Sequence, residues 1–85
     1  MAGVDLNAKV GVILLSDWDP IGIRDVPQTA DEYDAYAAPV ARMIAEERSE
    51  AELTAYLLEI ETEIFGLVGD TERARRVAAK LRSII

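Results

Sequence analysis

The sequence predicts an all-α fold, a compact single domain of four helices in 85 residues, and three observations support this prediction. Apolar residues recur at the 3.6-residue spacing of helices that bury one face. The Ser/Thr-x-x-Glu pattern of a helix start occurs twice, at Thr29 and at Ser49. A strand-like apolar run occurs only once, so it would have no partner in a sheet. We expect helices at about residues 5–18, 30–48, 50–65 and 71–84, with a structured Pro/Gly loop between the first two.

The first helix is expected to begin after Asp5, whose carboxylate can cap it. Its apolar positions share one face: Leu6, Val10, Ile13 and Leu14. Residues 10–15 could also form a short buried strand, because consecutive apolar residues carry no period of their own and Gly11 weakens a helix. The lack of a second such run favours the helix. Pro20 restricts the residue before it and so ends the helix no later than Asp19.

A loop over residues 20–28 leads to the second helix, and its apolar side chains can pin it to the core: Ile21, Ile23 and Val26. Thr29 and Glu32 have the spacing of a capping box, which starts the helix directly after Thr29. Pro39 conflicts with an uninterrupted helix, because it removes one hydrogen bond and its ring meets the carbonyl four residues earlier. Either the helix is kinked ahead of Pro39, which we favour, or residues 31–36 form a separate turn and the regular helix starts near Pro39.

The third and fourth helices carry the clearest signals. Ser49 and Glu52 form the second capping box. Gly66 suits the left-handed residue that ends a helix, and Asp70 can cap the next one. The buried faces of the last three helices are expected to hold Tyr33, Ala37, Val40 and Ile44, then Leu53, Leu57, Ile60 and Ile64, then Ala74, Val77, Ala78, Leu81 and Ile85. The bases of the fourth helix are expected to face mostly outward: Arg73, Arg75, Arg76, Lys80 and Arg82.

Composition limits the chemistry that the chain can perform. It contains neither His nor Cys, which removes the commonest general base and metal ligand and rules out disulfides and thiolate metal sites. The serines therefore have no imidazole partner, which argues against serine-type nucleophilic catalysis. The net charge of −7 disfavours nucleic acid and anionic membranes and favours a basic partner. No apolar run approaches the roughly 20 residues of a membrane span and no secretory signal is recognisable, so we expect a cytoplasmic protein without membrane contact.

The charge is unevenly distributed along the chain. Residues 1–40 and residues 41–66 each carry seven acids and two bases, whereas residues 67–85 carry two acids and five bases. A basic last helix complements its acidic neighbours and the negative end of its own dipole.

Acids and aromatic rings gather in residues 17–36, where Asp17 and Asp19 flank Trp18 beside Pro20. A tryptophan at a helix end typically fills the core and donates its indole N–H, while neighbouring aspartates cap or solvate the turn. We therefore expect Trp18 to be buried. The alternative is an oxygen-rich site for Mg²⁺ or Ca²⁺ that includes three further acids, although the spacing matches no calcium-binding loop. These acids are Asp31, Glu32 and Asp34.

Several glutamates lie on or near one side of the third helix: Glu52, Glu59, Glu61 and Glu63. Without histidine they match neither a zinc nor a di-iron signature. We expect them to form a solvated face, with pairing of some of them to the basic fourth helix as the alternative.

Two short motifs give a family resemblance. They are the turn Trp18, Asp19, Pro20, Ile21, Gly22 and the acidic element Glu32, Tyr33, Asp34. In this order the chain resembles the small bacterial YugE-like proteins, a family of unknown function. The resemblance implies a first helix, the tryptophan turn, an acidic element that opens a second helix, and two further helices. Pro39 departs from members whose second helix is uninterrupted, and the resemblance implies no catalytic residue.

The functional hypothesis is a non-enzymatic protein-binding module, of which immunity proteins and antitoxins are examples, that uses acidic side chains against a basic partner. Its expected contact residues are Asp17, Trp18, Asp19, Asp31, Glu32, Tyr33 and Asp34. One alternative is a small metal-dependent enzyme that uses carboxylates, and another is a homodimeric structural protein. No catalytic residue, metal ligand or cofactor is assigned.

Overall fold

Four α-helices, two of them extended by a π-helical turn, make up the described part of the chain, residues 6–23 and 32–84 of a computed structural model. The elements are α1 (Leu6–Ile13) with η1 (Leu14–Trp18), α2 (Asp34–Ala45), α3 (Glu50–Glu59) with η3 (Ile60–Ile64), and α4 (Thr71–Arg82). These residues contain no strand, so the predicted all-α fold is confirmed and residues 10–15 are helical.

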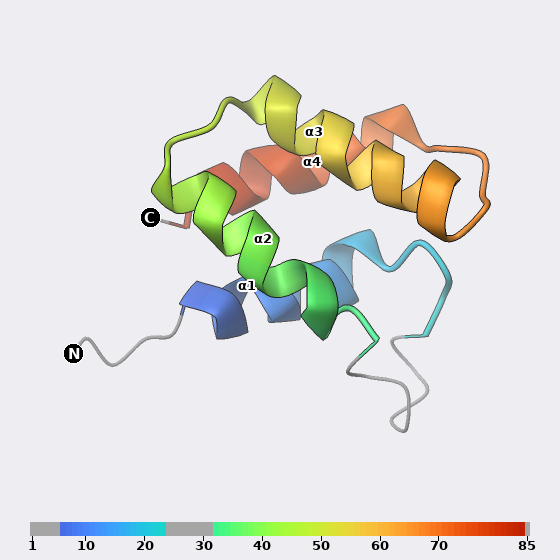
Figure 1. Cartoon of the computed structure of the whole chain (residues 1–85), viewed down its shortest axis with the longest axis horizontal. Helices are drawn as coiled ribbons and strands as arrows, with labels where there is room; N and C mark the ends of the chain where they lie inside the picture. Colours follow the sequence, from blue (N-terminus) through green and yellow to red (C-terminus); the bar gives the residue numbers. More distant parts are fainter. Residues whose placement is uncertain (1–5, 24–31, 85) are drawn as a thin grey trace.

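The helices lie in two layers, with α2 and α3 in front of α1 and α4 in the view of Figure 1. Helix α3 packs along α4 and α1 packs along α2, while α4 also contacts η1. In the front layer α2 and α3 diverge from the short turn that joins them, so that they form a V (Figure 1). In this view η1 is seen behind the open end of the V (Figure 1).

Buried side chains from all four helices form one hydrophobic cluster. The predicted inner face of α4 is confirmed from Ala74 to Leu81, and that of α2 from Ala37 to Ile44, with Tyr33 buried just ahead of the helix. On α1, Leu6 is half-buried and the other predicted positions are buried. Ile85 lies outside the described residues.

The predicted inner face of α3 is wrong at its last position, because Ile64 is 58% exposed. The cause is the π-helical turn η3, in which the Phe65 amide bonds the Ile60 carbonyl five residues back, at 3.0 Å. A π turn holds one more residue than an α turn, which rotates the following side chains by about 100°. Half-buried Phe65 therefore takes the inward position expected for Ile64, and Glu61 is buried at 0% exposure on the same side of the helix as Leu57, four residues earlier.

The second helix begins at Asp34 and continues through Pro39 to Ala45, so Pro39 lies inside the helix and does not start it. Pro39 is the sixth residue of α2, beyond the first turn, so it removes the intrahelical hydrogen bond to the Ala35 carbonyl, and the helix continues past it. The residue at the cap position is Tyr33, which makes no side-chain capping bond. Thr29, the expected cap, lies outside the described residues, as do Asp5 and Val26.

Local capping signals are confirmed in the second half of the chain. The Ser49 hydroxyl accepts a hydrogen bond from the Glu52 amide at 3.1 Å, and the Glu52 carboxylate accepts one from the Ser49 amide at 3.0 Å. Gly66 closes η3 with a φ of +67°, and the Asp70 carboxylate caps α4 by accepting from the Arg73 amide at 3.0 Å. The capping signals at the start of α3, at the end of η3 and at the start of α4 therefore act as the sequence predicts.

Candidate functional site

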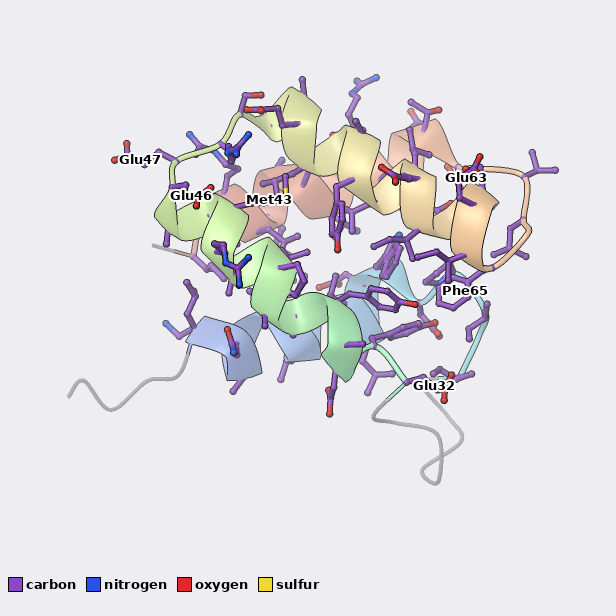
Figure 2. The ribbon with its side chains drawn as sticks, viewed as in Figure 1. Glu32, Met43, Glu46, Glu47, Glu63 and Phe65 are labelled. Atoms are coloured by element: carbon purple, nitrogen blue, oxygen red, sulfur yellow. The ribbon has the colours of Figure 1, made fainter. Side chains whose placement is uncertain are left out.

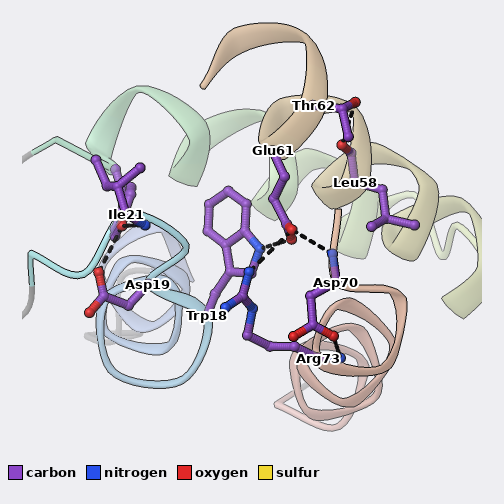
Figure 3. Close-up of polar contacts among 9 residues, drawn as sticks. Trp18, Asp19, Ile21, Leu58, Glu61, Thr62, Asp70 and Arg73 are labelled. Atoms are coloured by element: carbon purple, nitrogen blue, oxygen red, sulfur yellow. Dashed lines mark hydrogen bonds and ion pairs between the residues drawn. The ribbon is translucent and has the colours of Figure 1, made fainter. Parts of the chain in front are cut away.

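Trp18, at the end of η1, is buried at 1% exposure, which confirms the prediction for this residue. Its indole N–H donates a hydrogen bond to Oε2 of Glu61 at 2.8 Å (Figure 3). The two residues are 43 positions apart and each lies in one of the two π-helical turns. Because π turns often occur at functional positions, this pair is the natural centre of a candidate site.

The second carboxylate oxygen of Glu61 organises the start of α4. Oε1 accepts a hydrogen bond from the Asp70 amide at 3.0 Å and one from Nη2 of Arg73 at 3.1 Å (Figure 3). The main-chain carbonyl of Glu61 also accepts from the Leu67 amide at 2.8 Å. One side chain therefore connects η1, η3, the loop before α4 and α4 itself.

Burying a carboxylate is unfavourable unless a counter-charge and hydrogen bonds compensate for the lost water. Here Glu61 has both, because its oxygens accept three hydrogen bonds and Arg73 supplies a positive charge. The Arg73 side chain is 24% exposed, and its Nε atom is buried without a hydrogen-bond partner among the described residues. The expectation that this glutamate lies on a solvated face is wrong, and the alternative of pairing with the fourth helix is correct for it.

Four aromatic rings pack together where η1, the start of α2 and the end of η3 meet. Trp18 and Tyr33 have ring centroids 5.4 Å apart, and Phe65 lies 6.5 Å from Trp18 and 6.2 Å from Tyr33. Tyr36 meets Phe65 edge to face at 5.9 Å. Tilted and edge-on contacts at these distances are the favourable arrangements for aromatic pairs. The cluster therefore supports Trp18 and Glu61 from the side of the front layer.

Asp19 fixes the turn that follows Trp18. Its backbone is left-handed with a φ of 33°, and its Oδ1 accepts from the Ile23 amide at 2.7 Å and from the Tyr33 hydroxyl at 2.8 Å. The Tyr33 hydroxyl in turn accepts from the Ile21 amide at 3.3 Å. Burial raises the pKa of the Tyr33 phenol above its usual range, and the bond to Asp19 raises this pKa further. Asp19 is thus an internal anchor between the turn and the residue before α2.

The other predicted contact residues are dispersed over the surface. Asp17 is about one-third exposed and its carboxylate forms an ion pair with Nζ of Lys80 on α4 at 2.9 Å. Glu32 and Asp34 are exposed, and Asp31 lies outside the described residues. The predicted set therefore divides into interior residues, which present almost no surface to a partner, and exposed acids. The interior residues are Trp18 and Tyr33, with Asp19 half-buried beside them.

The chemical capacity of Glu61 is limited by its bonds. Both of its oxygens are occupied and it is inaccessible to solvent, so as folded it has no free position for a substrate proton. Within residues 6–23 and 32–84, no three acidic side chains lie close enough together to hold a metal ion. The arrangement is suited to holding a surface in a fixed shape.

Comparisons with other proteins do not identify a relative. No protein-family model, no curated protein and no solved structure matches the chain. Among the described residues, none of the helices is long and apolar enough to cross a membrane.

Proposed function

We propose that this protein is a non-enzymatic binding module that presents the acidic layer of α2 and α3 to a basic protein. The observation that carries the proposal is the separation of charge between the layers. Residues 34–64 contain eight acids and two bases, whereas Thr71–Arg82 contains one acid and five bases. Helix α3 lies in front of α4, so the acid-rich and the base-rich helix belong to different layers (Figure 1). The two signs of charge meet at the edge between them, where Glu50, Arg75 and Arg76 line one pocket.

The exposed acids of the front layer are available to a partner. Glu59 and Glu63 form no ion pair with another described residue, and the same is true of Glu32 and Asp34 near the start of α2. Unpaired charges gain most from an opposite charge on a partner, which speeds encounter and selects among partners. The proposed partner-binding surface therefore includes α3 and η3 in addition to the region around residues 17–34 that the sequence predicted.

Rigidity is the second property that suits this role. The Glu61 network and the aromatic cluster hold the two front helices in a fixed V, so little conformational entropy remains to be lost on association. A buried carboxylate with no accessible oxygen serves such a scaffold better than it serves catalysis. The proposal agrees with the resemblance to YugE-like proteins, which implies no catalytic residue.

The test is capture of partners from a lysate at low and high salt, followed by association kinetics with the captured protein. We expect the pair Glu59→Gln and Glu63→Gln, and separately the pair Glu32→Gln and Asp34→Asn, to slow association about two- to tenfold at low salt. Glu72→Gln on α4 is the matched control and should leave the rate unchanged. No salt-sensitive partner, or an unchanged rate for both pairs, would contradict the proposal.

The same charge separation favours one other function, assembly of identical chains front to back. Acidic α3 of one copy would then face basic α4 of the next, which is a heterologous contact that forms rings or filaments. Sedimentation at rising protein concentration and at low salt tests this alternative. A mass that stays at one chain removes it.

A further inference from the structure

The front layer has a strip of large, incompletely buried side chains between its two helices, here called the seam. Its members are Tyr36 and Met43 of α2, Tyr56 of α3, and Phe65 at the end of η3. Each packs against the buried core and keeps part of its surface exposed. Figure 2 shows Met43 on the side of α2 that faces α3, and Phe65 where η3 ends.

The seam residues share one support, because all four pack against the same buried core. Tyr36 contacts Phe65 edge to face at 5.9 Å. Tyr56 packs against the same core from α3, and burial raises the pKa of its phenol. Glu59 follows Tyr56 by three residues, so the two are neighbours on the surface of α3. Neither the Tyr36 nor the Tyr56 hydroxyl forms a hydrogen bond with another described residue. The strip therefore offers apolar area together with two hydroxyls that a partner can bind.

The composition of the seam is that of an interface centre. Tyrosine, phenylalanine and methionine are enriched in the buried cores of protein interfaces, and lysine, glutamate and aspartate are depleted there. Methionine adapts its shape to different partners because its side chain is unbranched and polarisable. Exposed scattered apolar residues are common on any protein, but four contacting a single boundary between two helices are a coherent patch.

The charge beside the seam indicates which kind of partner can bind there. Glu59 and Glu63 are exposed on α3 and η3, and Figure 2 shows the Glu63 side chain above η3, on the side away from α2. In a second copy docked seam to seam, each seam would again carry these acids, so the two surfaces would not be complementary in charge. A partner with bases beside an apolar stripe satisfies both the seam and its edge.

We infer that the seam is the docking site for an amphipathic helix of another protein, whose apolar face covers Tyr36, Met43 and Tyr56 and whose lysines or arginines meet Glu59 and Glu63. A helix fits because the boundary between two diverging helices accepts a third in the manner of helix-in-groove recognition. The inference rests on the proposed function and specifies its contact surface and the class of its partner.

The probe is a synthetic amphipathic peptide of leucine and lysine about 18 residues long, roughly 27 Å as a helix. A sequence-scrambled peptide of the same composition has the same charge without an apolar face. We expect the amphipathic peptide to bind at least tenfold more tightly than the scrambled one. Tyr56→Ala and Met43→Ala should each weaken binding of the amphipathic peptide about tenfold or more. Val12→Ala is the control, because Val12 is 66% exposed on α1, in the other layer.

A second measurement does not depend on variants that retain the fold. The chain has two methionines, so ¹³C-methyl labelling of methionine gives a simple spectrum in which Met43 is assigned with Met43→Leu. The Met43 methyl signal should shift as the amphipathic peptide is added.

The outcomes separate the inference from the proposed function. Equal binding of both peptides would mean that the protein recognises charge alone. This result would contradict the docking of a helix at the seam and would leave the proposed acidic binding module standing. Binding that leaves the Met43 methyl unshifted and is insensitive to Tyr56→Ala places the site elsewhere and also overturns the seam. If neither peptide binds at low salt, both proposals are wrong.

Discussion

The two ends of the α3–η3 rod each use a glutamate, and the two glutamates act in different ways. At the first end Glu52 is about half exposed, bonds the Ser49 amide and pairs with Arg48 at 2.9 Å. At the other end Glu61 is fully buried and bonds Trp18, 43 residues away, together with the Asp70 amide and Arg73. The first end depends on residues within four positions of Glu52 in the sequence. The second end depends on η1, the loop before α4 and α4 itself.

Solvent determines how much each arrangement contributes to stability. An exposed ion pair competes with water and is worth about 0 to 1 kcal/mol. A buried carboxylate that loses one partner leaves an unsatisfied group without water, which typically costs about 3 to 5 kcal/mol. We therefore expect substitutions at the Glu61 end to destabilise the fold several times more than those at the Glu52 end.

The largest expected effect is that of Trp18→Ala. The substitution removes a fully buried indole and the donor to Glu61, and should lower the free energy of unfolding by about 3 to 5 kcal/mol, a large part of a small domain's stability. Thermal and urea unfolding measure the loss. A melting temperature within a few degrees of the parent would show that the side chain is not part of the core.

Tyr33→Phe tests the hydrogen bond between Tyr33 and Asp19, which lies beside the Glu61 network. At neutral pH it should lower the free energy of unfolding by about 1 kcal/mol, because the bond to Asp19 is lost. The pH dependence gives the sharper result. The folded-state pKa of Tyr33 is raised, so its stabilising effect is complete below the unfolded value of about 10 and declines as the pH rises above it. The parent should therefore lose stability above about pH 10 more steeply than Tyr33→Phe. Parallel curves would contradict the buried phenol.

At the Glu52 end, Ser49→Ala should cost about 1 kcal/mol, the usual value for a lost N-cap. The Ser49 amide, followed by Arg48, lowers the pKa of Glu52. The Glu52 carboxylate therefore stabilises the fold fully above its unfolded-state pKa of about 4.3. This stabilisation disappears as the pH falls through the lower folded-state pKa. Acid titration of Glu52→Gln against the parent measures this difference. If Ser49→Ala or Glu52→Gln lowered the free energy of unfolding as much as Trp18→Ala does, the proposed difference between the two ends would be wrong.

The smallest effect is expected just ahead of α3, where Glu47 has a φ of 58°. This left-handed conformation is unfavourable for a residue with a side chain and natural for glycine. Glu47→Gly should raise the free energy of unfolding by about 0.5 kcal/mol, after allowing for the greater freedom of glycine in the unfolded chain. Ala45→Gly, inside α2, is the control and should be destabilising. A loss of stability in Glu47→Gly would contradict the assigned conformation.

The contrast between the two ends also explains what the sequence could predict. Ser49, Gly66 and Asp70 act on residues within a few positions, so their capping roles follow from spacing alone. Ile64 is predicted in the wrong environment because a π-helical turn shifts the helical period at Ile60, and Glu61 because a glutamate is expected on a solvated face. No local pattern announces such a turn. The burial of Trp18 was predictable from its type and position, but its acceptor was not, since the choice among several glutamates depends on tertiary packing.

The central claim is that Glu61 joins the first helix to the last two through Trp18, and a double-mutant cycle tests it most directly. Trp18→Phe removes the donor while keeping an aromatic ring, and Glu61→Met removes the acceptor while keeping an unbranched side chain of similar length. Urea unfolding of the parent, the two single variants and the double variant gives the coupling energy between the two sites. The account predicts a coupling of about 1.5 to 3 kcal/mol, the range for a buried hydrogen bond to a charged group. Additive losses, with a coupling below about 0.5 kcal/mol, would contradict it.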